Sequence, residues 1–459
     1  MKHLAREMTS DTRPAESPAN SGRKRRRSEK IWQKTRAMRE QLRESYRPVD
    51  RQLLVFSILM RLPSFMIALS VLLVMAHQTG EVSLGAYAAG LVALSSAATQ
   101  RTYRNLSRRV GYRRVLMVAA TLNIPAVAFL MIQTGRFTTS GAGGSIILLL
   151  LAALLAGLTT APLGSIMRLF WGGQYKEVKY RNNLIYASAF ESILDVIALP
   201  VAAAIVGLVS ILGGVQSSLF AVIVINVVGM MFVLWKPSAL NPQSLGSETS
   251  EPRVEDLGKD SQQLGWLPML GATFLGIAIG ATQSALVIRA VQTETLETVG
   301  IYLGIMGVAG AVTCLFLVGN LQRFATWEGW LLISGLLVMA TLTLSLPRAV
   351  FWTIFVLIFF GCAIGAALMC MDTIITRLSA RGNIVLAHSS TQSTYIGGLA
   401  LGYVWAVPMS NMTGQSASLL VPLVAATLFF CTGQLFGFQW RRRYEERLHL
   451  LQLERPKNK

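Results

Sequence analysis

The stretch QLLVFSILMRLPSFMIALSVLLVMA, residues Gln52 to Ala76, decides the class of this fold. Its single charged residue is Arg61, and about 20 mostly apolar residues are enough for a helix to cross the hydrocarbon core of a bilayer. The whole chain has the same character, because 53% of its 459 residues are hydrophobic and 14% are charged. That balance excludes a soluble protein with a water-facing surface.

Further apolar runs of about this length follow the first. They cover about residues 82–100, 115–135, 145–167, 184–208, 218–235, 265–288, 299–321, 329–346, 351–371, 384–408 and 417–439. A polar stretch that contains Pro and Ser, residues 236–264, separates the sixth run from the seventh. The sequence therefore predicts an all-α integral membrane protein with about 12 transmembrane helices in two pseudo-symmetric six-helix bundles.

A short motif repeats in the two halves. RNLSR at residues 104–108 follows the second run, and GNLQR at residues 319–323 follows the eighth. Equal positions in both halves indicate an internal repeat. The predicted parts are a basic cytoplasmic N-terminal tail (1–51), a first bundle (52–235), a cytoplasmic linker (236–264), a second bundle (265–440) and a basic cytoplasmic C-terminal tail (441–459).

The basic residues set the predicted orientation. With both termini in the cytoplasm, nearly all of the 42 Lys and Arg residues lie on cytoplasmic segments, whereas Arg136, Arg289 and Arg348 lie on the outer side. The net charge of +19 could also suit a nucleic acid, but basic residues spread between apolar runs line no single face. We therefore expect a multi-pass protein of the cell membrane with no nucleic-acid partner.

The N-terminal tail carries five consecutive basic residues, Arg23 to Arg27, and then a stretch, 28–47, in which apolar side chains recur near helical spacing. Two interpretations are open. The stretch is either a basic amphipathic helix on anionic lipid headgroups or a solvated, disordered tail. Anionic headgroups of the bilayer are accordingly expected partners of the basic tails.

Sequence motifs for enzymes, metals and cofactors are not found. The cysteines Cys314, Cys362, Cys370 and Cys431 lie inside apolar runs, without CxxC spacing or neighbouring histidines. Gly258-Lys259 is followed by Asp260, so no P-loop is formed, and no zinc-protease, nucleophile-elbow or dinucleotide motif occurs. We expect no enzyme, no cofactor and no metal.

Three ionisable residues lie inside predicted spans, where a charge is costly unless it is paired or hydrated: Arg61, Glu191 and Asp195. Glu191 and Asp195 are four positions apart and so share one helix face. At about 1.5 Å per residue, Arg61 and Asp195 both lie about 13 to 17 Å from the cytoplasmic ends of their spans, which allows an ion pair. Either a carboxylate exchanges a proton under the influence of Arg61, or the pair only fixes helix packing.

Polar residues in other spans are candidates for a cavity wall. His388 is either a proton relay or a hydrogen-bonded packing residue, and it belongs to a dense polar cluster that includes Gln392 and Tyr395. Asn123, Asn226 and Gln283 complete the candidates. Hydrogen bonds between helices explain each of them equally well.

These residues and their spacing resemble the major facilitator superfamily, in particular a bacterial drug-efflux-like group. The resemblance covers about Leu53 to Trp440, and its most specific parts are Arg61-Leu62-Pro63, the segment from Asn105 to Arg114 and Glu191 to Asp195. The second part is similar to the family signature Gly-x-Leu-Ala-Asp-Arg-x-Gly-Arg-Arg between spans two and three. The resemblance implies a gating loop with the residues Asn105, Leu106, Arg108, Arg109, Gly111, Arg113 and Arg114.

The departures from the family pattern also bear on function. Arg104 and Arg108 stand where the signature has its glycine and its aspartate, so the usual charge-paired lock is altered. The fifth-span motif of proton-coupled exporters is reduced to Leu199-Pro200, and the usual mid-membrane arginine of span four is replaced by Arg168 at the cytoplasmic end of that span.

The predicted function is a secondary transporter that works by alternating access and exports a small amphipathic or hydrophobic compound, with protons as the first candidate for the coupling ion. A transporter-shaped scaffold or sensor that moves nothing is one alternative. A facilitated metabolite carrier that needs no gradient is another.

Overall fold

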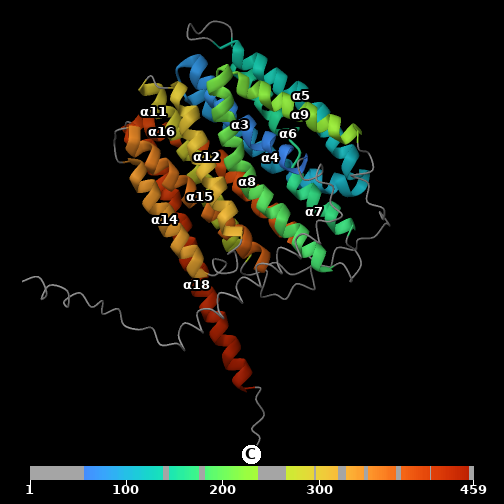
Figure 1. Cartoon of the computed structure of the whole chain (residues 1–459). Coiled ribbons are helices and arrows are strands. Elements are labelled where there is room, and N and C mark those ends of the chain that lie inside the picture. Colours follow the sequence, from blue (N-terminus) through green and yellow to red (C-terminus); the bar gives the residue numbers. More distant parts are fainter. Residues whose placement is uncertain are drawn as a thin grey trace, which may run out of the picture. The chain divides into compact units, whose positions relative to one another are not determined.

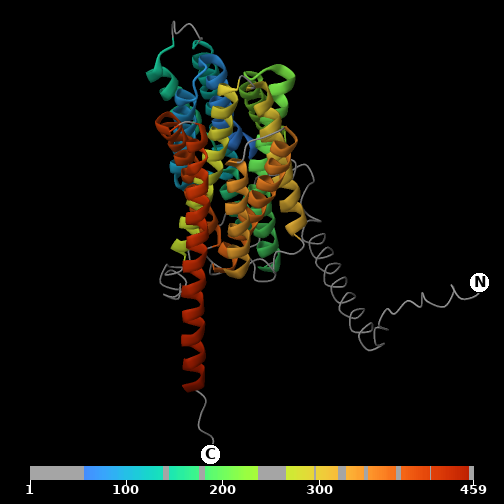
Figure 2. The same ribbon diagram turned by 90° about the vertical axis from the view of Figure 1, so that its left-hand side faces the viewer.

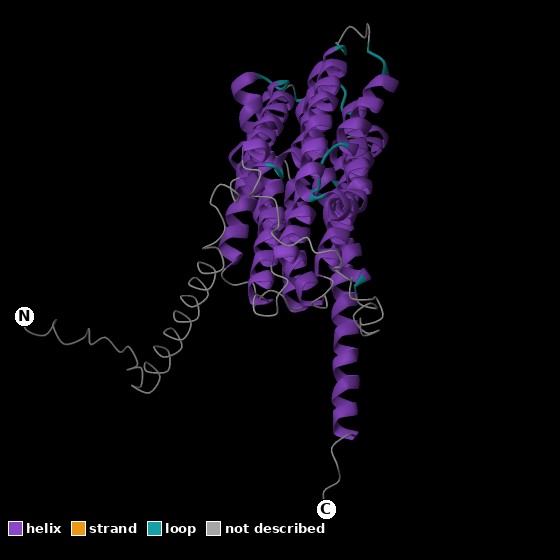
Figure 3. Ribbon diagram, turned by 90° about the vertical axis from the view of Figure 1, so that its right-hand side faces the viewer, coloured by secondary structure: helices purple, strands orange, loops and turns teal. Residues whose placement is uncertain are grey.

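The computed structural model describes residues 56–137, 144–174, 181–235, 265–293, 296–318, 327–345, 350–378, 384–413 and 415–453. These residues form helices joined by turns, and no strand occurs within the described ranges (Figure 3). The predicted all-helical fold class is confirmed. The basic N-terminal tail, the linker and the motif at 319–323 lie outside the described residues.

Two groups of helices follow one another along the chain (Figure 1). The first group consists of α3 (Leu62–Thr79), α4 (Ser83–Val110), α5 (Tyr112–Gly135), α6 (Ile146–Leu158), α7 (Leu163–Gln174), α8 (Arg181–Gly213) and α9 (Ser217–Trp235). The second group consists of α11 (Trp266–Gln292), α12 (Leu296–Val318), α14 (Trp327–Ser345), α15 (Val350–Leu378), α16 (Ile384–Thr413), the single turn α17 (Gln415–Ser418) and α18 (Leu420–Leu453).

Length and polarity divide the predicted spans into two kinds. Ten segments among the described residues are long and apolar enough to cross a membrane, and α6 and α7 together make one of them, Ile146–Trp171. The other two predicted spans are α4, with 28 residues, and α16, with 30. Both are more polar, and they pack against each other, where Ser393 Oγ donates to the Ala97 carbonyl oxygen at 3.3 Å. Their polar faces are therefore kept from lipid.

The two groups meet in a symmetric pattern. The main contacts between them are α4 against α16 and α8 against α12. Counted as spans, α4 is the second and α12 the eighth, whereas α8 is the fifth and α16 the eleventh. The second and eighth spans occupy equivalent positions in the two halves, and so do the fifth and eleventh. The two contacts are therefore equivalent to each other, as expected for an internal repeat. The division of the chain at the predicted domain boundaries stays a prediction.

Close approach of α8 and α12 depends on glycine. A Cβ atom added at Gly307 would collide with the Pro200 carbonyl oxygen, and one added at Gly207 would collide with the carbonyl oxygen of Gly300. Small residues at such crossings allow two backbones to touch, which supplies packing energy where no hydrophobic effect acts between helices.

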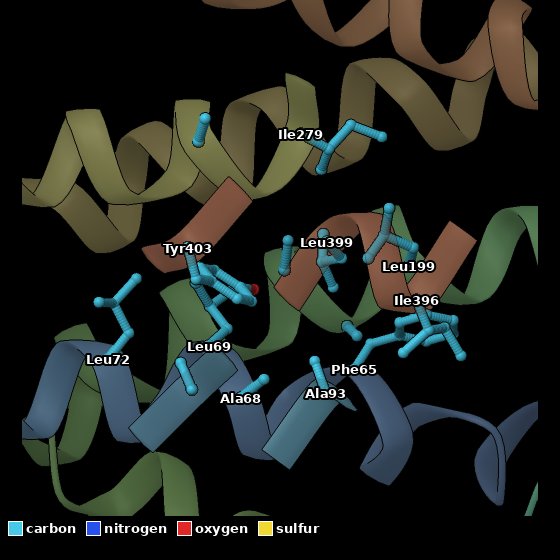
Figure 4. Packing of buried hydrophobic residues seen from close by; sticks show 14 of the residues in the cluster. Phe65, Ala68, Leu69, Leu72, Ala93, Leu199, Ile279, Ile396, Leu399 and Tyr403 are labelled. Carbon is cyan, nitrogen blue, oxygen red and sulfur yellow. The ribbon is translucent and has the colours of Figure 1, made fainter. Parts of the chain in front are cut away.

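Buried apolar side chains fill the space where α3, α4, α8, α11 and α16 converge (Figure 4). Phe65, Leu69, Ala93, Leu199, Ile279, Ile396, Leu399 and Tyr403 belong to this cluster. It draws from both groups of helices, so they share one core in this conformation.

The fourth span differs from the continuous run expected at 145–167. α6 ends at Leu158 and α7 begins at Leu163, with Thr159 to Pro162 between them. Pro162 has no N–H group with which to continue the α-helical pattern. α7 then continues to Gln174, so Arg168 lies within this helix, three residues before the end of the apolar segment Ile146–Trp171.

Two predicted connecting or terminal segments prove to be helical. The expected loop after the second span belongs to α4 as far as Val110, and only Gly111, with φ of 97°, separates it from α5. Glycine permits this left-handed value and so allows the sharp change of direction. α18 continues to Leu453, through much of the segment predicted as a tail, and extends beyond the other helices (Figure 2).

Candidate functional site

Arg61 lies at a distortion near the start of the first span. Residues 56–59 are helical, Met60 and Arg61 form a turn, and α3 begins at Leu62 with Pro63 in its first turn. Since proline is favoured in a first turn and cannot continue a helix from before it, Pro63 accounts for the distortion. The Arg61 guanidinium turns back, donates to the Ser57 carbonyl oxygen at 2.7 Å and also bonds the Ser57 hydroxyl.

Three charged side chains surround this guanidinium, of which Arg168 and Glu191 are buried and Asp195 is partly buried. Arg61 Nε donates to Asp195 Oδ1 at 2.7 Å, and Arg61 Nη2 donates to Glu191 Oε2. Arg168 Nη2 lies 2.6 Å from Asp195 Oδ2. The charge network, defined as Arg61, Arg168, Glu191 and Asp195, thus joins two cations to two anions, which is what burial of charge in a membrane protein requires.

The helices present these side chains by simple spacing. Glu191 and Asp195 are one turn apart on α8, as the sequence predicts, and Arg168 and Trp171 are three residues apart on α7. Trp171 Nε1 donates to Glu191 Oε1 at 2.8 Å. α7 can come this near because Gly164 has no side chain, and a Cβ there would overlap the Asp195 carboxylate.

The two carboxylates differ in access. Glu191 is 1% exposed, whereas Asp195 is 12% exposed and lines a cavity. The cavity lies between the two groups of helices and is lined from α3, α7, α8, α11, α15 and α16. Its volume is about 70 Å³, on a scale where one water needs about 10–15 Å³. Asp195 therefore belongs both to the charge network and to the cavity wall.

The second group of helices contributes its own polar pair to the same cavity. His388 Nδ1 on α16 lies 2.9 Å from Asp372 Oδ1 on α15, and both residues line the cavity. His388 was a candidate from the sequence, but Asp372 was not, because it directly follows the apolar run predicted to end at residue 371. Its position was the signal that could have identified Asp372, because a carboxylate directly beside a predicted span is costly unless it is paired or hydrated.

The other cavity candidates are divided among three places. Gln392 and Tyr395 line the cavity, and Gln392 Oε1 and the Tyr395 hydroxyl are buried without a hydrogen-bond partner among the described residues. Gln283 lies away from this wall and accepts a hydrogen bond from the Tyr403 hydroxyl at 2.5 Å. In this conformation Gln283 therefore forms a hydrogen bond between helices and does not line the cavity.

Asn123 and Asn226 lie at the break in the fourth span. Asn123 Nδ2 donates to the Ala156 carbonyl oxygen at 3.0 Å and to the Thr159 hydroxyl at 2.9 Å. Asn226 Nδ2 donates to Asn123 Oδ1 at 3.0 Å. The two amides thereby satisfy polar groups that the broken helix leaves open, and they line a second, smaller cavity within the first group of helices.

The residues of the expected gating segment lie elsewhere on the molecule. Asn105, Leu106, Arg108, Arg109 and Arg114 are exposed, and Gly111 and Arg113 are partly buried. Arg104 is buried, although it stands where the family signature has glycine. None of these residues lines the cavity between the two groups, and their role in gating stays a prediction.

Within the described ranges, no cluster of three His, Cys, Asp or Glu side chains could hold a metal ion. The site therefore consists of ion pairs, hydrogen-bonding groups and an apolar wall. Groups of this kind can bind a small molecule.

Apolar spanning helices in two related groups, with a charged cavity between them, define an α-helical membrane transporter with an internal repeat. The family model of the Major Facilitator Superfamily matches residues 53–407. The chain belongs to this superfamily and is a multi-pass secondary transporter, not an enzyme.

Solved structures share the fold at low sequence identity. The human organic anion transporter MFSD10 (TETRAN) is 13% identical, with a TM-score of 0.62, over 84% of this chain and 100% of that one. The nucleoside transporter NupG is 13% identical, with a TM-score of 0.58, over 83% of this chain and 97% of that one. No curated protein matches the sequence.

Proposed function

We propose that the protein is an alternating-access exporter of a small amphipathic or hydrophobic compound, driven by proton antiport across the cell membrane. Both termini lie in the cytoplasm in this proposal, because basic residues gather on that side of the predicted spans. The basic tails rest near anionic lipid headgroups. The observation that carries the proposal is a carboxylate, Asp195, that belongs at once to a buried charge network and to the cavity wall.

Asp195 is the proton-exchanging group in this proposal, and Glu191 is a holding group. Asp195 reaches the cavity, through which a proton or water can arrive, whereas Glu191 is 1% exposed and is held by Arg61 and Trp171. Both interpretations of the intramembrane charges then apply, each to a different carboxylate. Glu191 fixes helix packing, and Asp195 titrates.

Movement of the helices supplies the coupling. Two guanidinium groups beside Asp195 favour its charged form. When α7 and α8 separate as the cavity changes sides, the contact between Arg168 and Asp195 lengthens, and the carboxylate then takes a proton more readily. Proton binding is thereby linked to one side of the transport cycle, and release to the other.

A transport assay separates the roles of the two carboxylates. Cells that lack or overproduce the protein are first screened against a broad compound panel, which includes organic anions and nucleosides because the structural neighbours carry these names. Flux of an identified compound is then measured in liposomes with an imposed proton gradient. We expect Asp195→Asn to keep exchange of labelled for unlabelled compound and to lose accumulation driven by the proton gradient. Transport by Glu191→Gln should keep its dependence on pH.

The same assay decides between the competing functions. Full pH dependence in Asp195→Asn would remove the proposed proton role. Binding without flux in the wild-type protein would indicate a scaffold or sensor, and bidirectional flux that ignores the gradient would indicate a facilitated carrier.

A further inference from the structure

Four exposed arginines lie around the turn between α4 and α5. Arg101, Arg108 and Arg109 belong to the C-terminal part of α4, and Arg114 belongs to the first turn of α5. These four residues are named the arginine patch. At about 100° per residue, the three on α4 fall within about 100° of the helix circumference, so they share one face. The patch therefore presents its positive charge on the surface of the molecule.

Carboxylates are scarce near this patch. The described residues of the first group include only three, of which two belong to the charge network. The third, Glu81, precedes the opposite end of α4. Arg101, Arg109 and Arg114 form no hydrogen bond or ion pair among the described residues. Nothing in this part of the chain therefore neutralises these three charges.

Neighbouring helices place the turn at the end of the membrane-spanning segments. α4 has 28 residues, which makes it about 42 Å long, whereas the hydrocarbon core is about 30 Å thick. The Tyr112 hydroxyl, at the start of α5, donates to the Leu169 carbonyl oxygen at 3.1 Å, and Leu169 lies near the end of the apolar segment Ile146–Trp171. The ring of Tyr112 packs edge-on against Phe170. Aromatic residues gather at the level of the lipid headgroups.

Exposed apolar side chains adjoin the arginines on α4. Leu106 and Val110 are 41% and 43% exposed, and at about 100° per residue they lie next to the basic face, on the side of Arg109. A soluble anion would gain nothing from these apolar side chains. A phospholipid, by contrast, offers both a phosphate and acyl chains. The neighbouring basic and apolar faces therefore favour a lipid partner.

Further hydrogen-bond donors lie at the same turn. Arg113 Nε is buried and has no hydrogen-bond partner within the described ranges. No side chain caps the start of α5, so its first amide groups have no side-chain acceptor. Phosphate oxygens accept hydrogen bonds from guanidinium groups and from backbone amides alike. The turn thus combines positive charge with donors that suit a phosphate group.

We propose that the arginine patch is a binding site for an anionic phospholipid. The lipid phosphate accepts hydrogen bonds from the guanidinium groups, and the acyl chains lie against Leu106 and Val110. A zwitterionic lipid is held less tightly, because its headgroup carries no net charge to attract the arginines. The site is formed by helices of the first group and is separate from the basic tails, so it goes beyond the proposed transport function.

The test measures which lipid lies beside the patch. A bimane fluorophore is attached at Val118→Cys, one turn after Arg114 on α5 and 56% exposed in the native chain. The four native cysteines are changed to serine. The full-length protein is reconstituted in vesicles of phosphatidylcholine with a small fraction of phosphatidylglycerol. Brominated acyl chains, which quench bimane at short range, are carried either by the phosphatidylglycerol or by an equal amount of phosphatidylcholine.

Quenching should depend on the position of the label. We expect brominated phosphatidylglycerol to quench the label at Val118→Cys about fivefold more strongly than brominated phosphatidylcholine, because the patch concentrates the anionic lipid there. The control for position is a label at Ile132→Cys, which is 55% exposed in the native chain and lies near the other end of α5. The two lipids should quench that label equally.

Substitutions in the patch then test its charge. Arg109→Gln/Arg114→Gln should abolish the preference for phosphatidylglycerol at the Val118→Cys label. Arg109→Lys/Arg114→Lys should retain most of it, because the positive charges remain. The matched control, Arg136→Gln/Arg289→Gln, removes two arginines at the C-terminal ends of α5 and α11 and should leave the preference unchanged.

Equal quenching by the two lipids at Val118→Cys would overturn the proposal. So would a preference that survives Arg109→Gln/Arg114→Gln, since another basic segment would then be its source. Added glycerol phosphate should have no effect, and loss of the preference in its presence would overturn the lipid site in favour of one for a free anion. No transported compound is used, so the result does not depend on the proposed function.

Discussion

Arg61 and Asp195 are 134 positions apart in the sequence and are joined by a hydrogen bond of 2.7 Å between Nε and Oδ1. The bond ties the first span to the fifth inside the first group of helices. The same guanidinium also holds Glu191 and Ser57. Arg61 is therefore the centre of the charge network, which should be highly sensitive to its loss.

Replacement of Arg61 by methionine should lower stability by about 3–5 kcal/mol, because Glu191 is left as a buried charge without its cation. The double variant Arg61→Met/Glu191→Gln removes that charge and should recover much of the loss, since the amide oxygen still accepts from Trp171. Thermal unfolding of the purified proteins in detergent provides the measurement. Equal unfolding midpoints for the single and double variants would show that the loss of stability does not come from the unpaired charge of Glu191.

Substitution of Gly164 by alanine should impair transport by displacing Asp195. The added methyl group overlaps the Asp195 carboxylate, which must move away from Arg61 and Arg168. We expect at least a tenfold loss of gradient-driven flux, with the protein still folded. Gly397→Ala is the matched control, because a Cβ atom there meets nothing within 4 Å. Equal flux in the two variants would argue against a positioning role for Gly164.

The crossing of α8 and α12 should tolerate no added methyl group at Gly307. An alanine there collides with the Pro200 carbonyl oxygen, and overpacking of this kind costs about 1–3 kcal/mol. Gly304→Ala, one turn earlier on α12, meets its nearest atom, the Ala204 carbonyl oxygen, at 3.9 Å and should be nearly neutral. The unfolding midpoints of the two variants compare the sites directly. The Gly307→Ala variant should unfold at a lower temperature than the Gly304→Ala variant.

The break in the fourth span should depend on Asn123 and Asn226 as a coupled pair. Each single change to alanine leaves buried polar groups unsatisfied and should cost about 1–3 kcal/mol. Because Asn226 donates to Asn123, a double-mutant cycle should give a coupling energy of about 0.5–3 kcal/mol. Strict additivity in thermal unfolding would mean that the two amides act independently.

The sequence predicts the fold class because bilayer thickness sets span length, so hydropathy alone locates the helices. Hydropathy does not show how a span is interrupted. Pro162 signals the break in span four, but the polar partner that stabilises it, Asn123, comes from another helix. Similarly, α4 and α16 are more polar than the other spans, and the sequence does not show that they pack against each other.

The sequence predicts only part of the candidate site, because hydropathy and helical spacing act along one helix at a time. Depth along a helix brings Arg61 and Asp195 to one level, and helical spacing adds Glu191. Arg168 and Asp372 were placed at or beyond the ends of spans, because boundaries drawn from hydropathy stop at charged residues. Their pairing partners, Asp195 and His388, lie on other helices, and one sequence does not show which helices are neighbours.

The most direct test of the account asks whether the cavity opens alternately to both sides of the membrane. A single cysteine replaces Thr391, which lines the cavity, in a protein whose four native cysteines are changed to serine or alanine. A membrane-impermeant maleimide is then applied to intact cells and to inverted vesicles, with a cysteine at the fully buried Val127 as the control. We predict labelling of position 391 from both sides and of position 127 from neither. Labelling of position 391 from one side alone, or from neither, would contradict alternating access.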